Sequence, residues 1–115
     1  MDSQGSNASA KTLLESFVSS ALGLTIGPRV QNHNDLAAEY GISAQKANSD
    51  PRVCAAWETD RGPIYVCAKY DADESARLNA YVLLIEWWLP RHEHHEGWWH
   101  CYPNRPREWI KGRGL

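Results

Sequence analysis

Residues 52–71, RVCAAWETDRGPIYVCAKYD, decide the predicted fold because they carry the pattern of a β-hairpin. β-Branched and aromatic residues flank the turn sequence TDRG, in which Gly62 is suited to a left-handed backbone conformation. The stretch therefore predicts strands at 52–59 and 63–70.

The length of the hairpin loop sets the positions of two cysteines. In a three-residue loop with a bulge, Cys54 lies opposite Ala68, and the two thiols are on opposite faces of the sheet. In a two-residue loop, Cys54 lies directly opposite Cys67. The sequence leaves both registers open.

The stretch after the hairpin is ambiguous between helix and strand. Asp71 and Glu74 form a capping box, which predicts a turn or a short helical turn at 71–76. The residues that follow are rich in β-formers, and a helix there would be apolar almost all round. We therefore interpret them as a buried strand from about Leu78 to Leu89.

The C-terminal quarter predicts one further strand. RHEHHE at 91–96 is interpreted as a connection, and GWWHCY at 97–102 as the fourth strand. Pro103 and Pro106 disfavour a continuing strand, so the segment from about residue 103 is predicted to be irregular or to hold one helical turn.

The N-terminal third predicts helices. Residues 1–8 are small and polar and are expected to be disordered. Apolar residues recur at helical spacing from Ser9, the predicted cap, to about Leu22, and a second short helix is predicted from Asp35 to Tyr40.

Composition agrees with a single folded domain. The chain has 115 residues, of which 43% are hydrophobic and 23% charged, as in ordinary globular proteins. We expect one α+β domain over residues 9–115, with the N-terminal helices packed on one face of a four-stranded antiparallel β-meander. Three cysteines without tight spacing indicate free thiols, and with no leader pattern the expected location is cytoplasmic.

Four of the five histidines lie in residues 91–101, RHEHHEGWWHC. His92 and His94 would share one side of an extended segment, and His100 or Cys101 would approach from the partner strand, which would supply the ligands of a tetrahedral zinc site. No known ligand motif is present, however, and a solvated polar turn explains the same residues. A metal-dependent or Cys/His enzyme is therefore an alternative function, although the neighbours His100 and Cys101 face opposite sides of a strand.

Six tryptophans, mostly in adjacent pairs, are the more informative feature. In a strand each pair directs one ring to either face, so Trp88 and one of Trp98 and Trp99 are expected to form an exposed aromatic patch. Such patches mark binding sites, because tryptophan dominates binding hot spots. An aromatic core is the alternative.

The C-terminal segment is basic although the whole chain has a formal charge of −2. Residues 102–115 carry four cations against Glu108, a local charge of +3, which leaves −5 for the first 101 residues. Arg105 and Arg107 stand close to Trp109, a combination that suits single-stranded nucleic acid. The acidic remainder is unlike a dedicated nucleic-acid binder.

The sequence therefore predicts a small non-enzymatic interaction or inhibitor protein, of a size common among bacterial, phage and viral accessory proteins. The predicted binding residues are Trp88, Trp98, Trp99, Arg105, Arg107 and Trp109. Another protein is the expected partner, with nucleic acid and a second copy of the chain as alternatives, and no membrane contact is expected. No cofactor is expected either, apart from zinc on His92, His94 and His100 in the alternative function.

Overall fold

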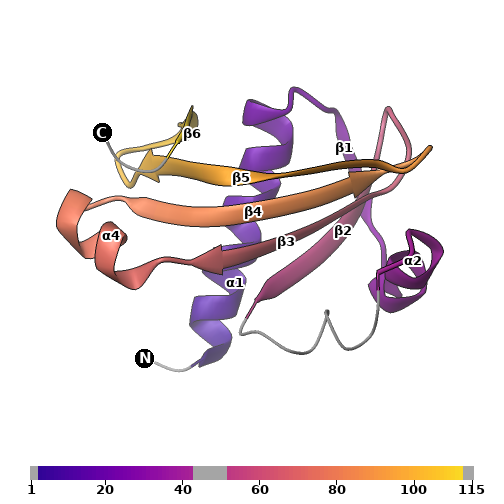
Figure 1. The fold of residues 1–115 in the computed structure, drawn as a ribbon, viewed down its shortest axis with the longest axis horizontal. Coiled ribbons are helices and arrows are strands. Elements are labelled where there is room, and N and C mark those ends of the chain that lie inside the picture. Colours follow the sequence, from indigo (N-terminus) through magenta and orange to yellow (C-terminus); the bar gives the residue numbers. More distant parts are fainter. Residues whose placement is uncertain (1–2, 43–51, 113–115) are drawn as a thin grey trace.

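The computed structural model describes residues 3–42 and 52–112, which form a curled antiparallel sheet with helices on both of its faces (Figure 1). The elements in chain order are α1 (Ser3–Ser16), η1 (Phe17–Ala21), β1 (Ile26–Arg29), α2 (His33–Glu39), β2 (Val53–Thr59), β3 (Ile64–Tyr70), α4 (Ala72–Leu78), β4 (Tyr81–Leu89), β5 (Glu93–Tyr102) and β6 (Arg105–Lys111). The predicted α+β class is confirmed.

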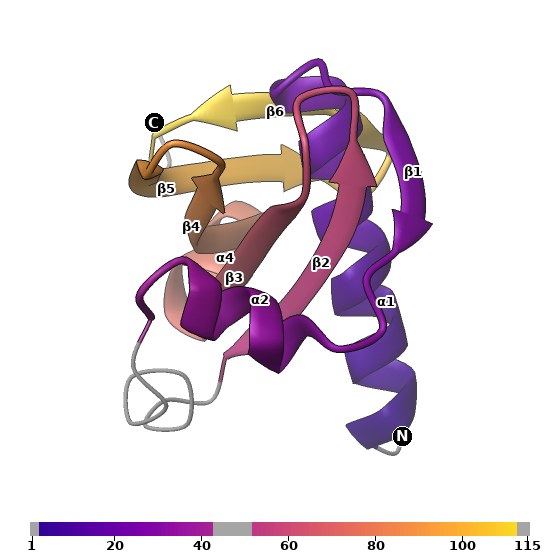
Figure 2. The same ribbon diagram turned by 90° about the vertical axis from the view of Figure 1, so that its right-hand side faces the viewer.

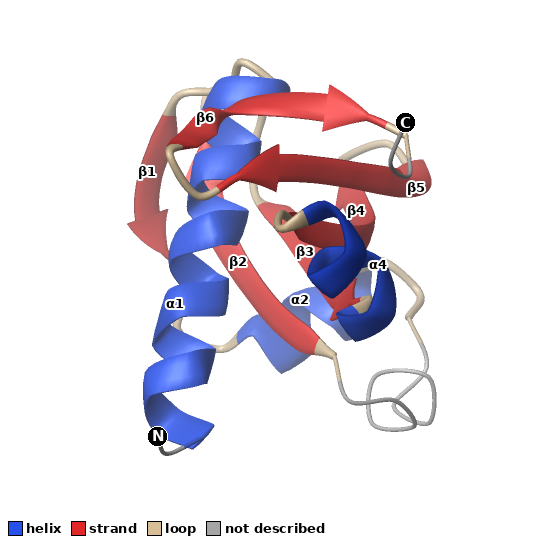
Figure 3. Cartoon of the chain, turned by 90° about the vertical axis from the view of Figure 1, so that its left-hand side faces the viewer, coloured by secondary structure: helices blue, strands red, loops and turns tan. Residues whose placement is uncertain are grey.

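The sheet is a continuous meander. Within the described part of the chain it holds six strands in the order β1-β2-β3-β4-β5-β6, and every neighbouring pair is antiparallel. The prediction of four strands was therefore wrong, because β1 and β6 extend the meander at its two edges. Figures 2 and 3 show the sheet curling around α1, with β1 and β6 both near the C-terminal end of that helix.

The β2–β3 turn decides the register that the sequence left open. Thr59 and Gly62 exchange both backbone hydrogen bonds, with N···O distances of 3.2 and 3.0 Å, so the loop between them has two residues. Cys54 consequently lies directly opposite Cys67. Gly62 has a φ of 97°, and a Cβ atom there would lie 2.7 Å from Cγ of Pro90, so both the backbone and the available space require glycine.

The two N-terminal helices lie on opposite faces of the sheet, and not on one face as predicted. Phe17 and Val18 of η1 belong to a core against the face that α1 covers, which we call the inner face. Leu36 and Ala37 of α2 pack on the other, outer face, where they belong to the same cluster as Trp88. The apolar stripe of a helix identifies the side that is buried, but it does not identify the face of the sheet that buries it.

Phe17 lies at the centre of the inner core. Its ring is fully buried and meets the indoles of Trp87, Trp99 and Trp109 edge-on, with centroids 5.3, 5.0 and 5.3 Å apart. These tryptophans belong to three successive strands, β4, β5 and β6. The last helical turn widens to π-helical geometry, in which the N–H of Leu22 donates to the carbonyl oxygen of Phe17 at 3.1 Å.

Both N-terminal helices begin earlier than predicted. α1 begins at Ser3, so the predicted cap Ser9 lies inside the helix and part of the segment expected to be disordered is helical. α2 begins at His33, and its end agrees with the prediction because Gly41 follows with a φ of 77°. None of the helices in the described residues reaches the length and hydropathy that a membrane span needs.

The ambiguous stretch is a short helix followed by a strand, as interpreted. Asp71 caps α4, because the backbone N–H of Glu74 donates to its Oδ1 at 3.0 Å. The helix continues to Leu78, so β4 begins at Tyr81, later than predicted. Asn79 ends α4 in a left-handed conformation with a φ of 53°.

The connection before β5 is shorter than predicted. Only Pro90, Arg91 and His92 separate β4 from β5, and Arg91 and His92 have φ angles of 69° and 59°. Residues 93–96, predicted as part of the connection, are therefore strand. Their histidine and glutamate side chains face both sides of the sheet near its end, so they show none of the apolar alternation by which a strand is recognised.

β6 corrects the prediction of an irregular C-terminal segment. Arg105–Lys111 is a strand in spite of Pro106, because β6 is an edge strand and a missing N–H at an edge breaks no ladder between two strands. The carbonyl oxygen of Pro106 accepts a hydrogen bond from Oγ of Ser16 at 2.8 Å. β6 is thereby attached to the end of α1.

Candidate functional site

Adjacent tryptophans separate onto the two faces of the sheet, as strand geometry predicts. Trp88 and Trp98 lie on the outer face, and their neighbours in the chain lie on the inner face. Trp88 is only 7% exposed, because it belongs to the cluster beneath α2, so the prediction that its ring is exposed was wrong. Trp98 is partly exposed and is the outward tryptophan of its pair.

Two other predicted binding residues take part in the inner core. Trp99 of β5 and Trp109 of β6 are partly buried, and both contact Phe17 on the inner face. The indole Nε1 of Trp109 is also 3.3 Å from Oγ of Ser16. Trp99 and Trp109 therefore have a structural role, because they pack the end of the N-terminal helix against the sheet.

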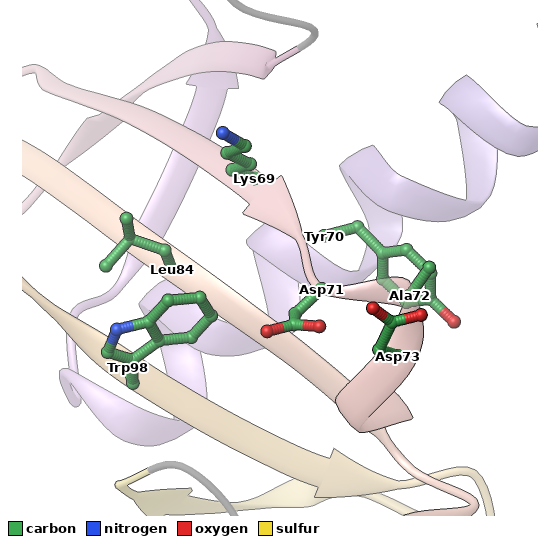
Figure 4. A pocket seen from close by; sticks show the side chains of 7 residues that line it. All are labelled: Lys69, Tyr70, Asp71, Ala72, Asp73, Leu84 and Trp98. Atoms are coloured by element: carbon green, nitrogen blue, oxygen red, sulfur yellow. The ribbon is translucent and has the colours of Figure 1, made fainter. Parts of the chain in front are cut away.

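A shallow pocket of about 340 Å³ lies on the outer face (Figure 4). Leu84 of β4 and Trp98 of β5 are cross-strand partners, and their side chains lie next to each other in the pocket. Lys69, the cross-strand partner of Leu84 on β3, stands at one border. The beginning of α4, with Asp71 and Asp73, forms another border. The pocket thus combines an apolar floor with charged borders.

Carboxylates outnumber cations around this pocket. Asp71 and Asp73 line it directly, and Glu96 is an exposed residue of the same face, two positions before Trp98 on β5. Lys69 is the cation among the described lining residues. The area around Trp98 therefore favours a positively charged ligand.

Backbone contacts hold α4 at the end of the sheet. The N–H of Val82 donates to Oγ of the buried Ser75 at 3.0 Å, and the N–H of Asp71 donates to the carbonyl oxygen of Val82 at 2.9 Å. These hydrogen bonds fix the acidic border relative to Leu84 and Trp98. The pocket is thereby built on regular elements and not on a loop.

The basic residues predicted for binding lie away from the pocket. Arg105 and Arg107 are exposed on β6, and Arg105 is opposite Tyr102 on β5. Tyr102 is four positions from Trp98, which corresponds to roughly 13 Å along an extended strand. The structure therefore separates the aromatic part of the predicted surface from its basic part.

The three histidines predicted for zinc do not converge. His92 lies in the turn before β5, and His94 and His100 are six positions apart on that strand, roughly 20 Å at the rise of an extended chain. His100 is buried, with its Nδ1 2.9 Å from the carbonyl oxygen of Gly112. Among the described residues, no cluster of three or more histidine, cysteine, aspartate or glutamate side chains is arranged to hold a metal ion.

A buried carboxylate on β4 was missed by the sequence analysis. Glu86 is 2% exposed, and its two oxygens are 3.0 Å from Nη1 of Arg52 and 2.7 Å from Nε2 of His94. The imidazole of His94 lies flat on the indole of Trp88, with centroids 4.7 Å apart and planes at 6°. The signal was a single glutamate in the apolar run of β4, because a buried carboxylate needs partners to offset its desolvation.

Two cysteines meet on the outer face beside this carboxylate. Cys54, Cys67 and Glu86 are successive cross-strand partners on β2, β3 and β4. A hydrogen bond from Cys67, helped by one from the Tyr65 hydroxyl and by the charge of Arg52, lowers the pKa of the Cys54 thiol to about 7. The pKa of Cys67 is raised by this same hydrogen bond to Cys54 and by burial.

The third cysteine has no part in this arrangement. Cys101 is fully buried, and its cross-strand partner is Tyr81, in the register that faces inward. Burial raises the pKa of its thiol to about 11. A Cys/His pair of Cys101 with His33 or His94 is therefore not formed, because both histidines lie on the outer face, against Tyr65 and Trp88. Comparison with known proteins adds no assignment to these residues, since no protein-family model, curated protein or solved structure matches the chain.

Proposed function

We propose that this chain is a binding protein that recognises a positively charged segment of another protein through the pocket of Leu84 and Trp98. The observation that carries the proposal is the combination of a partly exposed tryptophan, an apolar floor and an acidic border on one rigid face. Tryptophan is enriched among the residues that contribute most to protein binding. An aliphatic or long basic side chain of the partner fits a pocket of about 340 Å³.

The charges favour a protein over a nucleic acid as the partner. Asp71, Asp73 and Glu96 would repel the phosphates of a strand stacked on Trp98. The cations that would follow such a backbone, Arg105 and Arg107, are displaced along the sheet from the indole. The same carboxylates would attract a lysine or arginine side chain of the partner, whose apolar stem would contact Leu84.

Affinity capture from extracts of the cells that express the protein tests this proposal. The immobilised wild-type chain is compared with Trp98→Ala and with Glu96→Lys, and captured proteins are quantified by mass spectrometry. We expect the partner of the wild type to be lost from both variants, with affinity reduced by about 30-fold for Trp98→Ala, the effect of a hot spot of about 2 kcal/mol. Titration of the purified partner then measures the affinity directly.

A matched charge reversal provides the control. Glu108→Lys changes an exposed carboxylate on β6 and leaves the pocket intact, so the partner is expected to bind it as it binds the wild type. Equal capture by all variants would contradict the proposal, as would equal loss in Glu96→Lys and Glu108→Lys. Capture that disappears after nuclease treatment would instead identify a nucleic acid.

A further inference from the structure

Cys54 and Cys67 lie opposite each other where the two strands are closest. Thr59 and Gly62 form a hydrogen-bonded pair at the turn, and hydrogen-bonded and non-hydrogen-bonded pairs alternate along an antiparallel ladder. Counted from the turn, Cys54 and Cys67 are a non-hydrogen-bonded pair, for which the Cα atoms are about 4.5 Å apart. A disulfide spans about 4.4–6.8 Å between Cα atoms, so the backbone is already placed for one.

The side chains of this pair are turned toward each other. The two cysteines are free thiols whose Sγ atoms are 2.6 Å apart. Both belong to the cluster beneath α2, in which Cys67 is 4% exposed and Cys54 is half-buried. A small reagent therefore reaches Cys54 first, and the less exposed Cys67 lies beside it on the neighbouring strand.

The surroundings assign different tasks to the two sulfurs. A hydrogen bond from Cys67, together with the Tyr65 hydroxyl and the charge of Arg52, stabilises a thiolate at Cys54, the more accessible of the two positions. Cys67 keeps its proton at neutral pH, because its hydrogen bond to Cys54, its burial and the charge of the neighbouring thiolate all raise its pKa. A more exposed, ionised cysteine next to a buried, protonated one is the arrangement of an attacking and a resolving cysteine.

We propose that Cys54 and Cys67 are a reversible redox site that exchanges with low-molecular-weight disulfides, with Cys54 attacking and Cys67 resolving. The proposal rests on cross-strand geometry and does not use the pocket of Leu84 and Trp98, so either proposal stands if the other fails.

The exchange proceeds in two steps. The Cys54 thiolate attacks one sulfur of a disulfide RSSR, which forms a mixed disulfide Cys54–S–SR and releases RS⁻. The released thiolate takes up the proton of Cys67, and the Cys67 sulfur then attacks Sγ of Cys54 and displaces the second RS⁻, which is protonated by water. The protein dithiol loses two electrons and two protons, and RSSR becomes two RSH. A reduced thiol in excess drives the same steps in reverse.

Oxidised glutathione is the probe for the test. The folded wild-type chain is incubated with it at about pH 7.5, and intact mass and free thiols are followed with time. We expect the loss of two hydrogen atoms, one remaining thiol at Cys101, and full recovery with reduced glutathione. A wild-type chain that keeps three thiols while it is folded would overturn the proposal, as would a stable glutathione adduct without an internal disulfide.

Single substitutions separate the two tasks. Cys67→Ser is expected to accumulate the glutathione adduct on Cys54, and Cys101→Ser is expected to behave as the wild type. In the wild type, Cys54 is expected to react about tenfold faster or more than Cys101, because its ionised fraction is far larger. Faster reaction of Cys67 than of Cys54 would overturn the assignment. Circular dichroism of each variant verifies that it is folded, and the wild-type experiment decides the proposal if Cys67→Ser is not.

Discussion

The indole of Trp99 meets the ring of Phe17 edge-on, with centroids 5.0 Å apart and planes at 76°. Phe17 is fully buried and makes comparable contacts with two other tryptophans, so its removal opens a cavity between α1 and the sheet. We expect Phe17→Ala to lower the free energy of unfolding by about 3–5 kcal/mol. Urea denaturation followed by circular dichroism measures the change.

Trp98→Ala provides the comparison for this prediction. Trp98 follows the alternation to the outer face and is partly exposed, so we expect its truncation to lower the unfolding free energy by about 1 kcal/mol or less. Losses of similar size in Phe17→Ala and Trp98→Ala would contradict the separation of core and surface rings on which the proposed function depends.

The sequence predicted the strands and the orientation of their side chains better than it predicted how the strands and helices pack together. The strands at 52–59 and 63–70 and the opposite orientation of adjacent tryptophans were predicted because both depend on neighbouring residues alone. The strand β6 was missed because Pro106 is acceptable only at a sheet edge, and the sequence does not reveal which strand is at the edge. The cover that α2 places over Trp88 was missed for the same reason, since it depends on contacts between distant segments.

In the candidate sites, too, the sequence predicted the features that depend on neighbouring residues and missed those that depend on distant segments. The sequence identified Trp98, but the acidic border of its pocket comes from the position of α4, which only the fold defines. The sequence also reduced the cysteine register to two alternatives, and the backbone of a two-residue turn selected between them. The histidine cluster was misleading. His94 and His100 are close in the sequence, but they lie far apart in space because both are on one extended strand.

Glu86 is predicted to be the most sensitive charged residue of the outer face. Its carboxylate is buried and contacts both Arg52 and His94. Glu86→Ala therefore leaves the half-buried guanidinium of Arg52 without this opposite charge. We expect a loss of about 2–4 kcal/mol in the unfolding free energy. The control is Glu93→Ala, which removes a solvent-exposed partner of Arg61 and is expected to change stability little. Equal effects of the two substitutions would refute this account.

Gly62→Ala is predicted to destabilise the chain more than substitution of another left-handed glycine. A Cβ atom at Gly62 meets Pro90 at 2.7 Å, whereas at Gly23, with a φ of 68°, nothing lies within 4 Å. We expect about 1 kcal/mol for Gly23→Ala, the backbone cost alone, and at least about 2 kcal/mol for Gly62→Ala. Thermal denaturation of both variants measures the difference, and the same shift in both would show that Pro90 yields without cost.

The alkylation rate of Cys54 is predicted to change near neutral pH. Because the pKa of this thiol is lowered to about 7, the thiol is protonated and slow below that pH, and its rate approaches a plateau above it. Cys101, which is fully buried and has a pKa of about 11, is expected to react far more slowly than Cys54 at every pH at which the chain stays folded. Iodoacetamide labelling followed by peptide mass spectrometry measures both rates in one sample. Tyr65→Phe removes a hydrogen bond to Cys54 and is expected to shift its midpoint to higher pH.

The attachment of β6 to the end of α1 also determines when the core around Phe17 can be completed. Oγ of Ser16 donates to the carbonyl oxygen of Pro106, 90 positions later, and accepts from Nε1 of Trp109, 93 positions later. Each hairpin of the meander joins neighbours in the chain and can form as soon as its second strand has been synthesised. The helix that packs inside the curl of the sheet precedes β6 in the chain, yet some of its contacts come from β6. During translation, the side of Phe17 that contacts Trp109 therefore stays uncovered until β6 has left the ribosome.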